Sequence, residues 1–114
     1  MRANSVNSFP PEEAPRNKAV EQRVAKLIYD ELRGMGLTPK RLGMSQYRPN
    51  VLCSLGQKRF RKSLILNGHM DTVEPTGRWS VDPFSGVVRN ARLYGLGALD
   101  MKATLSAYVF LVRA

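Results

Sequence analysis

The aliphatic run Leu64–Leu66 is the feature that most constrains the fold, because it leads without interruption into Asn67-Gly68-His69. A strand with one face in solvent alternates apolar and polar residues, whereas a strand covered on both faces is apolar throughout. We therefore predict that residues 63–68 form a central strand of an α/β layer structure. Ligands of open α/β sheets bind beyond the carboxyl ends of the strands, which is where His69 would lie.

A second constraint is an amphipathic helix predicted over residues 20–35, which Gly36 and Pro39 would end. Its apolar residues recur at the three- and four-residue spacing of one helical face: Val20, Val24, Leu27, Ile28, Leu32 and Met35. Residues 51–56 have the composition of another strand.

The remaining patterns are a hairpin and a second helix. Residues 86–95 favour two short strands around a turn at Asn90-Ala91, and residues 100–114 favour a helix. The order helix, strand, strand, hairpin, helix fits the α/β class. Residues 1–17, with three prolines, are predicted to be irregular. Because the last helix is still running at residue 114, we expect residues 18–114 to be the N-terminal part of a larger, truncated domain.

Length and composition narrow the class of protein. A chain of 114 residues with 43% hydrophobic residues can bury one small core. No apolar run approaches the ~20 residues of a membrane span, and the N-terminus lacks the apolar stretch of a secretory signal. We expect a cytoplasmic protein that does not bind membranes. A single cysteine, Cys53, excludes a disulfide framework and a multi-cysteine zinc finger, and we expect it to be buried as a small hydrophobe.

The formal net charge of +9 raises the alternative of a non-enzymatic basic module that binds nucleic acid or acidic partners. The densest basic cluster lies at residues 57–63, where an exposed hairpin turn would also place solvated charge. Platforms that stack bases need several aromatic side chains, and this cluster has only Phe60. Nucleic acid is therefore the less favoured partner.

Three residues suggest a metal site. His69 would end the central strand, Asp71 follows two residues later, and Asp100 would open the last helix. An imidazole suits zinc, and its second nitrogen needs an acceptor such as Asp71 to fix the ring. A lone histidine at a strand end is usually not a ligand, however, and an aspartate before a helix is usually a cap. Spacing alone does not decide between these readings.

A family resemblance favours the metal site. "NGHMDTVEPTGRWSVDPFSG", followed by "RLYGLGALDMKA", resembles two motifs of the zinc-dependent aminoacylase and exopeptidase family, in the same order. That family includes acetylornithine deacetylase, succinyl-diaminopimelate desuccinylase, aminoacylase and carboxypeptidase G. The matching residues are Gly68, His69, Asp71, Val73, Trp79, Pro83, Phe84, Tyr94, Gly95, Gly97, Asp100, Met101 and Lys102. The sequence departs from the family pattern at several positions, among them Leu96 where arginine is common.

The resemblance implies a role for each site residue. His69 would ligate one metal ion, Asp100 would bridge two, and Asp71 would act in catalysis by orienting His69. It also implies a cis peptide bond between Asp100 and Met101. We expect Lys102 to be structural, exposed or bonded to nearby carbonyls. Around the site loop, core packing is expected of Trp79, Pro83 and Phe84.

The resemblance also implies the fold and the chemistry of a full-length parent. The fold would be the N-terminal part of a two-zinc catalytic domain, with a central mixed sheet flanked by helices. The parent would use zinc, or cobalt, to hydrolyse N-acyl amino acids or small peptides, and could dimerise through a domain absent here. The family's general base and remaining ligands lie beyond the Asp-Met-Lys stretch. We therefore expect this chain alone to bind zinc weakly and to hydrolyse nothing.

Overall fold

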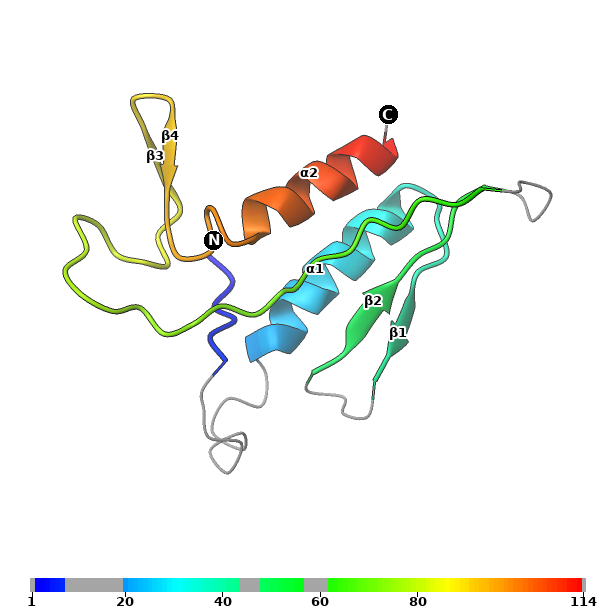
Figure 1. Ribbon diagram of the computed structural model, residues 1–114, viewed down its shortest axis with the longest axis horizontal. Helices are drawn as coiled ribbons and strands as arrows, with labels where there is room; N and C mark the ends of the chain where they lie inside the picture. The colour runs from blue at the N-terminus through cyan, green and yellow to red at the C-terminus, as the bar shows by residue number, and fades with distance from the viewer. Residues whose placement is uncertain (1, 8–19, 44–47, 57–61, 114) are drawn as a thin grey trace.

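The computed structural model describes residues 2–7, 20–43, 48–56 and 62–113. Within these residues, two helices and two antiparallel strand pairs form a small mixed α/β arrangement (Figure 1). Helix α1 spans Val20–Gly34 and helix α2 spans Lys102–Arg113, and the two helices contact each other. Of the helices that the structure describes, neither has the length and apolar character that crossing a membrane would need. Most of the basic cluster at residues 57–63 and most of the predicted irregular segment lie outside the described residues.

Helix α1 confirms the amphipathic pattern and ends where the glycines predict. Val24 and Leu32 of the predicted stripe are buried, together with Ala25, whereas Leu27 is exposed. Beyond the helix, the Leu37 amide donates to the Leu32 carbonyl at 3.1 Å and the Gly36 amide to the Arg33 carbonyl at 2.9 Å. This pair of bonds is a Schellman cap, which requires the positive φ of 79° that Gly36 adopts.

The strand pair β1 and β2 lies beside α1. Strand β1, Lys40–Leu42, which the sequence did not predict, pairs antiparallel with β2, Asn50–Leu52. The predicted strand over residues 51–56 was therefore too long, because pairing ends at Leu52. The Arg41 guanidinium lies 4.5 Å from the centre of the Tyr29 ring, a cation–π contact that ties β1 to α1.

The prediction of a central strand at residues 63–68 is wrong for this structure. The segment is extended, but no ladder pairs it with another strand among the described residues. Its apolar side chains are not covered either, since Leu64 and Ile65 are 83% and 82% exposed. An apolar run specifies a strand that neighbours can cover, and here the neighbouring strands are not among the described elements. Pairing begins only at Thr72, in one parallel bridge with Val6.

The second strand pair is the predicted hairpin. Strands β3, Val87–Arg89, and β4, Arg92–Tyr94, pair antiparallel around Asn90 and Ala91. Both turn residues have positive φ, 51° and 56°, as a type I′ turn demands. The turn suits Asn90, but Ala91 carries a Cβ that disfavours this conformation.

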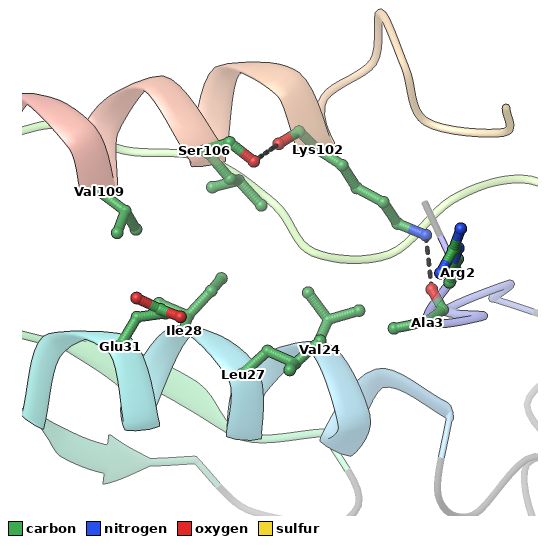
Figure 2. Close-up of a pocket in the computed structure, with 10 residues that line it drawn as sticks. Arg2, Ala3, Val24, Leu27, Ile28, Glu31, Lys102, Ser106 and Val109 are labelled. Carbon is green, nitrogen blue, oxygen red and sulfur yellow. Dashed lines mark hydrogen bonds between the residues drawn. The ribbon is translucent and has the colours of Figure 1, made fainter. Parts of the chain in front are cut away.

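The buried hydrophobic core is small and centred on α1. Among the described residues it consists of Val24, Ala25, Leu32 and Leu96. Next to it an open groove of about 520 Å³ runs between the two helices (Figure 2). Leu27 and Ile28 of α1 and Leu105 and Val109 of α2 line its length, and Lys102 lies at one end.

We predict that Ala91→Gly stabilises the chain by about 1 kcal/mol, because it removes the cost of a Cβ at positive φ. Denaturant unfolding followed by circular dichroism measures the change. Ala103→Gly, at an exposed position of α2, is the matched control and should destabilise by about 1 kcal/mol. A loss of stability in Ala91→Gly would contradict the assigned turn.

Candidate metal centre

His69 contacts both of the other residues singled out from the sequence, Asp71 and Asp100. Nε2 of His69 lies 2.9 Å from Oδ1 of Asp100. On the other side of the ring, Nδ1 of His69 lies 3.1 Å from the backbone carbonyl oxygen of Asp71 and 3.2 Å from its Oδ1. Each ring nitrogen thus faces acceptors of a different aspartate. The ring is held between two segments that are distant in sequence.

Close backbone approach brings these segments together. A Cβ at Gly68 would lie 2.7 Å from Cε of Met101 and 2.9 Å from Cδ2 of Leu105, so glycine lets the chain run against the start of α2. The next amide, that of His69, donates to Sδ of Met101 at 3.3 Å. The Asp100–Met101 peptide bond is cis, as the resemblance implied.

The turn that carries Asp100 is fixed by backbone bonds. The Lys102 amide donates to the Gly97 carbonyl at 2.8 Å, and the Ala98 amide donates to the Gly95 carbonyl at 3.0 Å. The Leu96 amide donates to the Pro83 carbonyl at 2.7 Å, which joins this turn to the preceding loop. Leu96 itself is buried, so an aliphatic side chain suits this position.

Lys102 is a structural residue and is not exposed. Its side chain is buried, and Nζ donates to the backbone carbonyl of Ala3 at 2.8 Å (Figure 2). Burial lowers the pKa of the Lys102 ammonium, because removing the charge from water disfavours the protonated form. The bond ties the N-terminal segment to the first residue of α2.

The packing expected around the site loop holds only in part. Trp79 is 40% exposed and donates Nε1–H to the Thr76 carbonyl at 3.2 Å, so the core position predicted for it is wrong. Its loop is exposed from Val73 to Ser80. Pro83 and Phe84 are half-buried, as is the free thiol of Cys53, which was expected to be buried.

Two residues at the site escaped the sequence reasoning. Nδ2 of Asn7 donates to Oδ2 of Asp71 at 3.1 Å, and Nη2 of Arg48 donates to Oδ1 of Asn7 at 2.6 Å. No spacing rule connects positions 7, 48 and 71. The only signal was that residues 5–14 and 48–56 resemble opening segments of the same family.

The neighbours of His69 set its charge. Partial burial is the largest single influence and disfavours the charged ring, but the hydrogen bonds and negative charges of Asp71 and Asp100 together outweigh it. The pKa of His69 is therefore raised above its ordinary value. Protonation of His69 therefore stabilises the folded state. The contribution is fully present at pH values below the pKa that His69 has in the unfolded chain, and it is lost as the pH rises through the pKa of His69 in the folded chain.

The donor set fits part of a zinc site. Two ligands on one tetrahedral zinc lie about 3.3 Å apart, since each bond is about 2.0–2.2 Å, and the donors of His69 and Asp100 are separated by 2.9 Å. Both donors reach solvent, since their side chains are 48% and 81% exposed. Among the described ranges, no three His, Cys, Asp or Glu side chains gather closely enough to hold a metal ion. Catalytic zinc usually takes three protein ligands, so His69 and Asp100 would supply an incomplete set.

Comparisons with known proteins find relatives of the sequence that carries these residues. Residues 65–114, which contain both motifs, match Peptidase family M20/M25/M40. The similar curated proteins include succinyl-diaminopimelate desuccinylases. That of Nitrosospira multiformis is 34% identical over 94 residues, which are 78% of this chain and 23% of the relative. That of Rhodospirillum centenum is 36% identical over 89 residues, which are 72% of this chain and 22% of the relative.

A third relative has a higher sequence identity over a shorter stretch of the chain. The succinyl-diaminopimelate desuccinylase of Anaplasma marginale is 51% identical over 47 residues, which are 41% of this chain and 12% of the relative. The chain thus spans less than a quarter of the length of these relatives. No solved structure matches it significantly. The matches confirm the resemblance: the chain carries sequence of Peptidase family M20/M25/M40.

We predict that the titration midpoint of His69 lies above the ordinary value and falls in Asp100→Asn, which removes one neighbouring charge. Proton NMR reads this directly, because the chain has a single histidine. Asp30→Asn is the control, since Asp30 pairs with Lys26 on α1 and does not contact the ring. An unchanged midpoint in Asp100→Asn would refute the contact.

We also predict that Gly97→Ala destabilises more than Gly77→Ala. Both glycines have positive φ, +81° and +72°, which costs an alanine about 1–2 kcal/mol. Only at Gly97 would the Cβ also press on neighbours, 2.9 Å from Cγ2 of Thr72 and 3.0 Å from Cδ of Lys102, which adds about 1–3 kcal/mol. Chemical denaturation of both variants measures the difference. Equal losses would show that the turn does not pack on Thr72.

Proposed function

We propose that this chain contributes part of the metal site of a hydrolase that cleaves the amide bond of N-acyl amino acids or small peptides. One observation carries the proposal. His69 and Asp100 lie in the two motifs of the family match, and their donor atoms converge to 2.9 Å. Hydrogen-bond acceptors on Asp71 face the other ring nitrogen, as in many zinc-binding histidines.

The residues have distinct roles in this proposal. His69 would bind one metal ion through Nε2, Asp100 would bridge two, and Asp71 would hold the imidazole in the orientation that leaves Nε2 free. Zinc supplies Lewis-acid polarisation of the scissile carbonyl. Cobalt is an alternative ion, because imidazole and carboxylate ligands suit both. Exposure of both donors gives a substrate access to the site.

The relatives suggest a narrower substrate. Their printed names describe removal of the succinyl group from succinyl-diaminopimelate, and we propose an N-succinyl amino acid of this type as the first substrate to test. Residues 18–114 would be the N-terminal part of the catalytic domain. A cytoplasmic location and a homodimeric parent complete the proposal. The basic binding module stays a prediction from charge alone, since residues 57–61 are not described.

We predict that the 114-residue chain binds zinc weakly, with affinity in the micromolar range or poorer, and releases no succinate from N-succinyl-diaminopimelate. Two protein donors are too few for tight binding. Isothermal titration measures zinc affinity, and His69→Ala and Asp100→Asn should each reduce it further. Asp30→Asn should leave it unchanged. Tight binding to the wild-type chain, or binding that survives both site substitutions, would contradict the assignment.

Sequencing the gene past codon 114 provides a second test. The family resemblance implies that the general base belongs to a Glu-Glu pair and that a further ligand is a later histidine, so both should follow in the same reading frame. In that longer protein, His69→Ala should abolish desuccinylation. If the frame continues without them, the hydrolase proposal fails.

A further inference from the structure

We propose that Asn7 and Arg48 are positioning residues, which fix the carboxylate of Asp71 and thereby the ring of His69. The inference rests on the proposed metal site and adds residues outside both motifs. It is carried by an unbroken series of side-chain contacts that runs from helix α1 to the imidazole.

The first step concerns the two oxygens of Asp71. Oδ1 lies 3.2 Å from Nδ1 of His69, and Oδ2 accepts a hydrogen bond from Nδ2 of Asn7 at 3.1 Å. A carboxylate held at one oxygen can still rotate about its side-chain bonds, whereas a carboxylate held at both is fixed. Asn7 therefore determines which way Oδ1 points.

The second step concerns the amide of Asn7, which can face either way. Nη2 of Arg48 donates to its Oδ1 at 2.6 Å. A guanidinium only donates hydrogen bonds, so it must face the carbonyl oxygen of the amide, and the NH₂ group is then turned toward Asp71. Glu21 of α1 in turn lies 3.4 Å from Nε of Arg48. The charge pair connects the helix to the series.

The third step is that the backbone places Asn7 at the site independently of its side chain. The Asn7 amide donates to the Thr72 carbonyl at 2.7 Å, and the Thr72 amide donates to the Ser5 carbonyl at 2.9 Å. These bonds flank the parallel bridge of Val6 with Thr72, next to Asp71. Replacing the Asn7 side chain should therefore leave the segment in place.

The experiment uses the single histidine as its reporter. Zinc is titrated into the labelled chain at one fixed pH while the ring signals of His69 are followed by NMR. Asn7→Ala should weaken zinc affinity by about 10-fold, at the low end of the losses seen when groups supporting a metal ligand are removed. Before zinc is added, the Nδ1–H proton signal should be broadened relative to wild type, because the Asp71 carbonyl still accepts from Nδ1 while the Asp71 carboxylate is no longer fixed. Arg48→Met should act in the same direction, and Arg48→Lys, which keeps a donor, should restore most of the affinity.

Matched controls separate positioning from folding. Asn4 lies in the same segment, and its Oδ1 accepts from the Val6 amide at 2.9 Å without reaching Asp71. Asn4→Ala should therefore leave both readouts unchanged. In an Asp71→Ala background, Asn7→Ala should have no further effect, because the proposed route through Asp71 is gone.

Each result bears on one proposal. Zinc affinity that is unchanged in Asn7→Ala but reduced in His69→Ala would overturn the positioning role and leave the metal site standing. Equal losses in Asn4→Ala and Asn7→Ala would also overturn it. If zinc never perturbs His69 in the wild-type chain, the metal site fails, and the Nδ1–H signal still decides whether Asn7 orders the ring.

Discussion

The imidazole of His69 joins two parts of the chain that have few other reasons to meet. Its Nε2 contacts Asp100, 31 residues away, and its backbone amide bonds to the Met101 sulfur. Both contacts require the extended segment before His69 to run against α2, which the missing side chain of Gly68 permits. The contact between His69 and Asp100 at the candidate site depends on this approach.

Local patterns predicted local structure well. The spacing of Val24, Ile28 and Leu32 along one face predicted a helix, and the asparagine at position 90 favoured a tight turn. Residues 63–68 show the limit of prediction from local patterns, because an apolar run becomes a strand only when other strands lie beside it. The same composition here gives an extended and exposed segment, with Leu64 and Ile65 in solvent.

The residues of the candidate site also divide into those that the sequence predicted and those that it did not. His69, Asp71 and Asp100 could be picked out because two motifs carry them, and the structure brings all three together. Asn7 and Arg48 could not, because their contacts depend on a parallel bridge between residues 6 and 72 and on the charge pair with α1. Such long-range pairing has no signature in sequence spacing. The motifs identify the candidate metal ligands, whereas the residues that orient these ligands can be identified only from the three-dimensional structure.

The anchor between Lys102 and Ala3 has an evolutionary consequence. The ammonium binds a main-chain carbonyl, which every amino acid provides, so the N-terminal segment is recognised by its path and not by its side chain at position 3. Substitutions there can accumulate without loosening the attachment. The lysine has no such freedom, because only a long cationic side chain spans the distance from the helix start. Of the two residues in this contact, Ala3 therefore tolerates substitution and Lys102 does not.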